Sequence, residues 1–171
     1  MWVDFFNTGK AGAAFYVYNG CKPDAPPRRY TVSSSQQLSD YWEPAAEQTA
    51  YDLSTYGRNG YLACFRGTAS WLARPEASVR YDRSSGDVYL VLANPGTEPC
   101  TLTAINSYAN GEIRHYELAA GATSEDRWPL VASSGWFDLS IAGIGNAFFL
   151  RRFAGHAETD RPGTSDPGHQ I

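Results

Sequence analysis

The chain repeats part of its own sequence after 86 positions. Over residues 28–57 this shift gives nine identities without a gap, where ordinary composition gives about 2 by chance. The identical pairs are Arg28/Arg114, Tyr30/Tyr116, Asp40/Asp126, Trp42/Trp128, Ala46/Ala132, Asp52/Asp138, Leu53/Leu139, Ser54/Ser140 and Gly57/Gly143. Self-similarity of this kind marks a duplicated structural unit, so the fold must be built from two copies of a unit of about 75 to 85 residues.

The similarity continues on both sides of this block. After Gly57 the second copy has two extra residues, and the match resumes at Leu62/Leu150 and Phe65/Phe153. On the other side we align residues 15–20 with residues 90–96, which makes the second copy 11 residues longer before the repeated block. Eleven residues correspond to one strand and a turn, so we expect the first repeat to be smaller or to borrow an edge strand.

Short segments rich in aromatic and β-branched residues alternate with Gly, Pro and Asn turns along the whole chain, as at residues 28–32 and 51–56. No long stretch has a helical apolar period. We therefore predict an all-β fold of two tandem immunoglobulin/fibronectin-like antiparallel β-sandwich repeats packed together. The predicted division is residues 1–73 for the first repeat, 74–157 for the second, and 158–171 for a polar tail.

Composition narrows the classes of function. An apolar content of 43% supports a packed core, and a net charge of −4 argues against nucleic-acid binding. The sequence has no run of 18 apolar residues, so it predicts no membrane-spanning helix. The cysteines Cys21, Cys64 and Cys100 form no CxxC or Cys/His cluster, so we expect no metal and no cofactor and leave disulfide pairing open. The first residues lack a signal-peptide pattern, so we expect a cytosolic protein or a piece of a longer one.

The repeated polar and aromatic residues allow two interpretations. Asp52 and Asp138 are either carboxylates for acid–base chemistry or calcium binding, or acceptors of structural hydrogen bonds. Trp42 and Trp128 are either aromatic platforms for a ligand or parts of the core. We favour the structural interpretation for the whole repeated set, namely Tyr30, Trp42, Asp52, Gly57, Tyr116, Trp128, Asp138 and Gly143.

Two further patterns bear on function. His156 with Ser54 or Ser140 suggests a catalytic triad, but no G-x-S-x-G motif is present, so we do not expect hydrolysis by this chain. The segment "FFLRRF" at residues 148–153 mixes aromatic and basic residues, which fits either a lipid interface or an edge strand guarded by charge. The candidate contact residues are Tyr61, Phe148, Phe149, Arg151 and Arg152.

Several longer motifs resemble a known family. They are "NTGKAGAAFYVYN", "RRYTV…LSDYW" and "YDLSTYGRNGYLACFRG" in the first repeat, and "GWFDLS…FLRRFAGHAETDRPGTSDP" in the second. In this order and in duplicate they resemble the C-terminal region of bacterial phosphocholine-preferring phospholipases C, where such a domain is a tandem pair that follows a catalytic domain of the acid-phosphatase-like superfamily. One departure is "GRNG", where the family pattern has "GPNG".

The resemblance implies a non-catalytic C-terminal module pair. An upstream domain would hydrolyse phosphatidylcholine to diacylglycerol and phosphocholine, so no catalytic residue carries over to this chain. The implied partners are that catalytic domain and a phospholipid membrane surface, and the implied location is secreted or periplasmic. The alternative, a free-standing β-sandwich that binds carbohydrate or protein, stays open.

Overall fold

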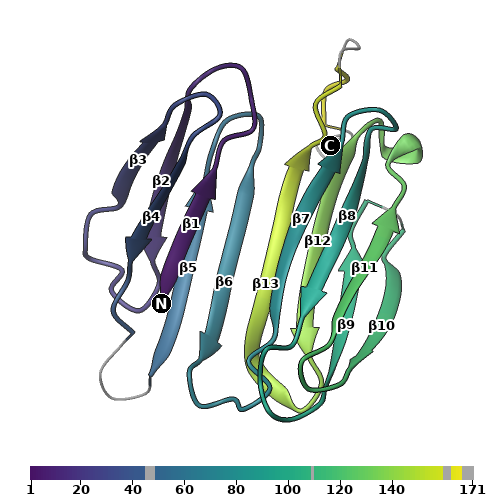
Figure 1. Ribbon diagram of the computed structural model, residues 1–171. Helices are drawn as coiled ribbons and strands as arrows, with labels where there is room; N and C mark the ends of the chain where they lie inside the picture. The colour runs from purple at the N-terminus through teal and green to yellow at the C-terminus, as the bar shows by residue number, and fades with distance from the viewer. Residues whose placement is uncertain (45–48, 109, 160–162, 167–171) are drawn as a thin grey trace.

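The computed structural model describes residues 1–44, 49–108, 110–159 and 163–166, which form antiparallel sheets and confirm the predicted all-β fold (Figure 1). Ala46, one of the repeated residues, lies outside the described part. The elements are β1 (Trp2–Phe6), β2 (Ala13–Asn19), β3 (Arg28–Val32), β4 (Gln37–Tyr41), β5 (Ala50–Tyr56), β6 (Leu62–Thr68), β7 (Glu76–Asp82), β8 (Asp87–Ala93), β9 (Cys100–Asn106), β10 (Glu112–Leu118), β11 (Thr123–Trp128), the 3-10 turn η1 (Val131–Ser133), β12 (Trp136–Gly143) and β13 (Asn146–His156).

One large sheet runs through both repeats. Its eight strands lie in the order β10-β9-β12-β13-β6-β5-β2-β3. Two smaller sheets pack on the same side of it, β1-β4 over the first repeat and β11-β8-β7 over the second (Figure 1). Each repeat is thus a two-layer sandwich, and the two sandwiches share their larger layer.

The two repeats match strand by strand. The repeated block places β3, β4, β5 and β6 on β10, β11, β12 and β13, and the sheet order then places β2 on β9 and β1 on β8. Our alignment of residues 15–20 with 90–96 is therefore wrong, because it sets β2 against β8. Asn7 and Asn94 are the true equivalents, 87 positions apart at the ends of β1 and β8.

These two asparagines make the same contacts. The side-chain amide of Asn7 donates to the carbonyls of Ala11, Val32 and Ser33, and that of Asn94 donates to the carbonyls of Glu98, Leu118 and Ala119. In both turns the side-chain oxygen accepts from the amide of a glycine two residues later, Gly9 or Gly96. Each asparagine thus ties its own turn to the end of an outermost strand of the large sheet, β3 in the first repeat and β10 in the second.

The difference in size between the repeats lies at β7. This strand pairs along β8, whereas β1, the equivalent of β8, pairs with β4 alone among the described strands. We predicted that the second repeat has one strand more than the first, and the structure confirms this difference. The extra strand precedes β8, however, and does not follow it as the misalignment implied.

Strands β6 and β13 join the repeats by antiparallel pairing. Cys64 lies opposite Arg152, and these two residues are also equivalent positions of the two repeats. Going outward from this pair, Phe65 lies opposite Arg151 and Ala63 lies opposite Phe153. The register is therefore symmetric about the centre of the junction.

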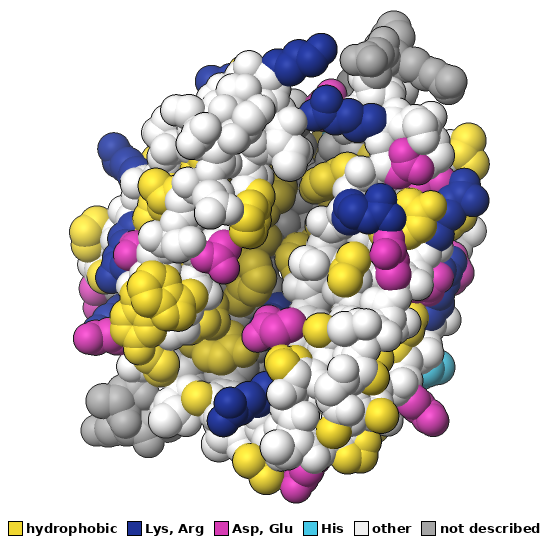
Figure 2. Space-filling model, viewed as in Figure 1, with side chains coloured by type: hydrophobic (Ala, Val, Ile, Leu, Met, Phe, Trp, Pro, Cys, Tyr) yellow, Lys and Arg dark blue, Asp and Glu magenta, His cyan; other side chains and the backbone are white. Residues whose placement is uncertain are grey.

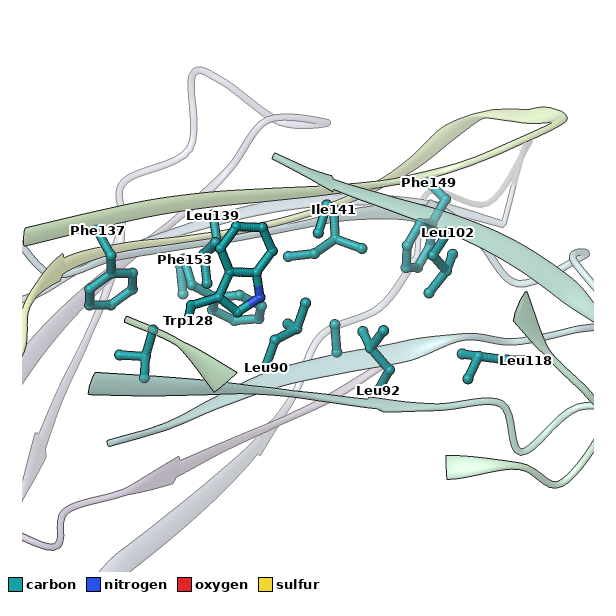
Figure 3. Packing of buried hydrophobic residues seen from close by; sticks show 14 of the residues in the cluster. Leu90, Leu92, Leu102, Leu118, Trp128, Phe137, Leu139, Ile141, Phe149 and Phe153 are labelled. Carbon is teal, nitrogen blue, oxygen red and sulfur yellow. The ribbon is translucent and has the colours of Figure 1, made fainter. Parts of the chain in front are cut away.

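The hydrophobic core is divided between the repeats. The second repeat has the larger cluster, in which Leu90 and Leu92 of β8 face residues of the large sheet and the Trp128 indole lies between the layers (Figure 3). Alternate residues of β8 point into this cluster, as expected for a half-buried strand of Val and Leu. The smaller cluster of the first repeat consists of Val3, Phe5, Val17, Val32, Trp42 and Leu53.

Candidate functional site

The repeated residues of the first repeat form one connected group. Asp40 accepts hydrogen bonds from Arg28 at 2.8 Å and from the Tyr30 hydroxyl at 2.6 Å. The Arg28 guanidinium lies 4.0 Å from the centre of the Trp42 ring, within the range of a cation–π contact. Because Arg28 and Tyr30 belong to β3 and Asp40 belongs to β4, the group links the two layers of the sandwich.

The second repeat builds the same group. Asp126 accepts from Arg114 at 2.8 Å and from the Tyr116 hydroxyl at 2.6 Å, and the guanidinium lies 3.9 Å from the Trp128 ring centre. Burial alone would raise the pKa of Asp126, but the hydrogen bonds from Tyr116 and Arg114 outweigh it and hold that pKa below its ordinary value. Burial and the bond to Asp126 raise the pKa of Tyr116. The tyrosine stays protonated and the aspartate stays ionised, which suits a structural clamp.

The repeated aspartates of β5 and β12 lie on the other face of the large sheet. Asp138 accepts two hydrogen bonds from Arg152, at 2.8 and 2.6 Å, in a two-pronged ion pair. Asp52 packs against Gly20, where an added Cβ would come within 2.8 Å of its carboxyl carbon. In the part of the chain that the structure describes, no group of three His, Cys, Asp or Glu residues is arranged to hold a metal ion.

His156 and Ser54, two of the residues considered for a triad, have other partners. The His156 ring lies 3.1 Å from the carbonyl of Ser134 and packs against Trp136, with ring centres 5.1 Å apart. The Ser54 hydroxyl lies 3.6 Å from the sulfur of Cys64. All three cysteines are free thiols.

The five predicted lipid-contact residues do not form one surface. Phe149 is 4% exposed and Arg151 is 1% exposed, so these two assignments are wrong. The reason is strand alternation, since residues 149, 151 and 153 of β13 point toward the core while their neighbours point away. Tyr61 is half-buried against the larger core cluster, and burial raises its pKa.

The remaining two candidates are differently placed. Phe148 is 63% exposed near the start of β13. Arg152 lies on the outer face of the large sheet, but its charge is already engaged by Asp138. Of the five, Phe148 alone offers a large apolar side chain to the surroundings.

Arg151 instead connects the repeats from inside. Its guanidinium donates to the Tyr51 hydroxyl at 2.7 Å and to the carbonyl of Arg66 at 3.0 Å, both in the first repeat. It also lies 3.5 Å from a carboxylate oxygen of Glu76 and 4.6 Å from the Phe149 ring centre. A buried charge is costly unless it is paired, and these contacts supply the pairing.

The large sheet leaves one face uncovered by either small sheet, and three tyrosines stand on it. Tyr16 and Tyr18 of β2 and Tyr56 of β5 are between 42% and 48% exposed. Tyr16 lies directly opposite Tyr56, and the rings of Tyr18 and Tyr56 meet edge to face with centres 5.6 Å apart. They line an open groove of about 700 Å³ together with Asn19, Gly20, Pro23, Ala25 and Ser54. We call these three residues the tyrosine face.

A second apolar feature lies at the end of the β12–β13 hairpin. Ile144 and Phe148 are more than half exposed there, as is Leu72 in the segment between β6 and β7. Trp71 holds the two segments together, because its ring packs on Phe149 at 5.3 Å and fills the space beside Gly143. We call Leu72, Ile144 and Phe148 the apolar tip.

Our sequence analysis missed the tyrosine face, although the sequence carried a signal for it. In "FYVYN" the residues Phe15 and Val17 alternate with Tyr16 and Tyr18, and Val17 is buried while both tyrosines are exposed. Such alternation is expected of a strand with one covered face. Leu72 and Ile144 lie outside strands and carried no such signal.

Comparison with known proteins gives the family. The family model described as "Bacterial phospholipase C, C-terminal domain" matches residues 1–68 and 75–156. A non-hemolytic phospholipase C of Burkholderia pseudomallei is 47% identical over 169 residues, which cover 96% of this chain and 24% of that protein. The non-hemolytic phospholipase C of Pseudomonas aeruginosa is 39% identical over 97% of this chain and 25% of its own length.

The hemolytic phospholipase C of Pseudomonas aeruginosa is 36% identical over 82% of this chain and 22% of its own length. The chain thus spans about a quarter of the length of the relatives that it matches. Within the described residues, no helix has the length and apolarity needed to cross a bilayer. The match over both repeats shows that this chain belongs to the family of bacterial phospholipase C C-terminal domains.

Proposed function

We propose that this chain is the non-catalytic C-terminal module of an exported bacterial phospholipase C, secreted or periplasmic, whose separate catalytic domain hydrolyses phosphatidylcholine. Two observations support the proposal. The relatives are phospholipases C about four times as long as the matched region. The repeated residues Asp40, Asp126 and Asp138 are engaged in hydrogen bonds that link strands and layers.

The module supports the catalytic domain through its tyrosine face. The observation that carries this role is the uncovered side of the large sheet, where three adjacent tyrosines stand about half exposed around an open groove. Tyrosines are enriched at protein interfaces because they bury a large apolar area and keep a polar end. A docked domain would cover them.

The test uses the full-length enzyme and the isolated chain in parallel. The double substitution Tyr18→Ser and Tyr56→Ser should lower the melting temperature of the full-length enzyme by several degrees more than it lowers that of the isolated chain. Tyr41→Ser is the matched control, because Tyr41 is 45% exposed but belongs to the small sheet. Equal shifts in the two proteins would contradict docking at the tyrosine face.

The apolar tip favours a second role, contact with a phospholipid surface. The β12–β13 turn and the segment between β6 and β7 lie at the same end of the molecule (Figure 1), and Leu72, Ile144 and Phe148 in this region are each more than half exposed. Exposed apolar side chains bind a bilayer surface by burying their apolar area at the boundary between headgroups and acyl chains. The tip therefore offers the parent enzyme a way to hold its substrate surface.

Co-sedimentation with phosphatidylcholine vesicles tests this role. The isolated chain should bind, and the pair Ile144→Ser and Phe148→Ser should reduce the bound fraction at least threefold. Val131→Ser is the control, because Val131 is 88% exposed and lies in η1. Failure of the unaltered chain to bind would remove the lipid role and leave the supporting role. Turnover of a soluble phosphocholine ester by this chain alone would contradict the non-catalytic assignment.

A further inference from the structure

Among the strands that the structure describes, β1 pairs with β4 alone, which leaves the other edge of β1 open. Met1 and Trp42 exchange backbone hydrogen bonds at 2.7 and 2.8 Å, and the amide of Asn7 donates to Gln36 at 3.0 Å. In an antiparallel pair such bonded positions recur at every second residue, so the intervening amides point away from β4. The amides that point to the open edge are those of Trp2, Asp4 and Phe6.

The second repeat shows what lies at the equivalent edge. There β7 pairs along the whole of β8, and residues of β7 cover the aromatic side chains below. Tyr81 of β7 lies 5.9 Å from Phe137, ring centre to ring centre. Phe137 and Phe153 of the large sheet are 0% and 5% exposed under this cover.

The equivalent aromatic residues of the first repeat lack this cover. Tyr51 is the equivalent of Phe137, and Phe65 is the equivalent of Phe153. Both are only half-buried. Figure 2 shows the surface hollowed between the two small sheets, with hydrophobic side chains at the bottom of the hollow. The first repeat thus has two partly exposed aromatic residues, Tyr51 and Phe65, below the open edge of β1. The second repeat has the extra strand β7 at the equivalent place.

We propose that an added strand completes the first repeat by pairing antiparallel with β1 along this edge. The occupant to which we commit is the polypeptide that precedes residue 1 in the longer protein. In the second repeat the strand at this position comes directly before its partner, through the short turn of residues 83–86. The matched relatives are about four times as long as this chain, which leaves ample polypeptide for the same connection.

The geometry also defines the chemistry of the added strand. Ala77, Val79 and Tyr81 of β7 face the core side, while Ser78 and Arg80 face away. The occupant should have the same alternation, with apolar residues over Tyr51 and Phe65. This inference rests on the proposed place of the chain within a longer phospholipase C, but not on the docking or lipid roles, because it concerns pairing within the first repeat.

Amide hydrogen exchange measured by NMR tests the proposal directly. The 171-residue chain is compared with a version that its natural gene extends upstream by roughly 20 residues, enough for one strand and a turn. In the longer version the amides of Trp2, Asp4 and Phe6 should exchange at least tenfold more slowly. Those of Val3 and Phe5, which face β4, should be slow in both versions. An extension of equal length made of Gly and Ser serves as the control and should leave the edge amides fast.

Two outcomes would overturn the proposal. If the edge amides exchange equally fast in the naturally extended version, no preceding strand pairs with β1. If they become protected in the 171-residue chain as its concentration rises, with the mass of a dimer in solution, a second copy of the chain is the occupant. Both readouts are independent of enzymatic activity.

Discussion

The two repeats have the same group of residues linking their layers, here called the clamp, but their small sheets cover the large sheet to different extents. Both link their layers through an Arg, a Tyr, an Asp and a Trp with nearly identical distances. The second repeat has three strands in its small sheet and the first has two among the described residues. The residues that join the layers are therefore identical in the two repeats. These identities do not indicate how completely the small sheet covers the core of each repeat.

This comparison gives the contacts of one repeat as a reference for the other. Equivalent residues share type, strand and partners, so a difference in their effect on stability measures the surroundings alone. The core leucines, the turn asparagines and the aspartates bound by Arg and Tyr are three matched pairs of this kind. For all three, the free energy of unfolding is measured by chemical denaturation.

The largest effect is expected for the core leucines. Leu53 and Leu139 are equivalent and both are almost fully buried. Leu139→Ala should cost about 4 kcal/mol, because the surrounding layers of the second repeat cannot collapse into the cavity. Leu53→Ala should cost about 2 to 3 kcal/mol, because the half-open neighbourhood of the first repeat can relax. Equal losses would show that the missing cover does not loosen the first core.

An intermediate effect is expected for the turn asparagines. Asn94 is fully buried and Asn7 is half-buried, although both bridge three carbonyl groups. Asn94→Ala should cost about 2 to 3 kcal/mol, since it leaves buried carbonyls without a donor. Asn7→Ala should cost about 1 kcal/mol, because water can replace the lost bonds. A larger loss at Asn7 would contradict this account.

The smallest effect is expected for the clamp aspartates, and it depends on pH. The pKa of Asp126 is lowered despite burial, by hydrogen bonds from Tyr116 and Arg114. The pKa of Asp40 is lowered first by the hydrogen bond from Tyr30. A lowered folded-state pKa stabilises the fold above the ordinary value of 3.8, and this stabilisation is lost as the pH falls below 3.8 through the folded-state pKa.

Replacing either aspartate by asparagine should therefore destabilise at neutral pH and flatten the loss of stability in acid. Asp126→Asn should cost about 1 kcal/mol at pH 7, and Asp40→Asn about half as much, because solvent screens the more exposed pair. The Arg28 side chain is 47% exposed and that of Arg114 is 25% exposed. Unfolding curves recorded between pH 2 and pH 7 check both the size of the loss and its dependence on pH. An unchanged acid slope in the Asp126→Asn variant would count against the clamp.

Much of the fold was predictable because the residues that occur in both repeats are the ones that hold the strands and layers together. Trp, Tyr, Asp and Gly recur at fixed spacing only when they meet the same neighbours twice, and that pattern predicted the two repeats and the all-β class. The alignment failed before residue 28 because the equivalence depends on Asn7 and Asn94 alone, within turns of three letters, "NTG" and "NPG". One shared asparagine is too little to set the alignment when the apolar strands β2 and β8 have similar sequences.

The sequence also did not show which face of the sheet each residue of β13 points to. The letters "FFLRRF" alternate imperfectly, so the pattern does not say whether Arg151 or Arg152 points outward. The structure puts the apolar neighbours Phe149 and Phe153 inside and takes Arg151 with them. Its burial depends on Tyr51 and the carbonyl of Arg66, which lie 100 and 85 positions away in the sequence. No local pattern predicts a partner at that distance.

The symmetric register between β6 and β13 has a consequence for the history and handling of this protein. Cys64 faces Arg152, its own equivalent, as residues do across the axis of a symmetric dimer. The chain thus resembles a homodimer whose two subunits have become covalently fused. Cutting it at residue 73 would bare two long strand edges that fit each other and copies of themselves. Separated halves should therefore aggregate or reassociate.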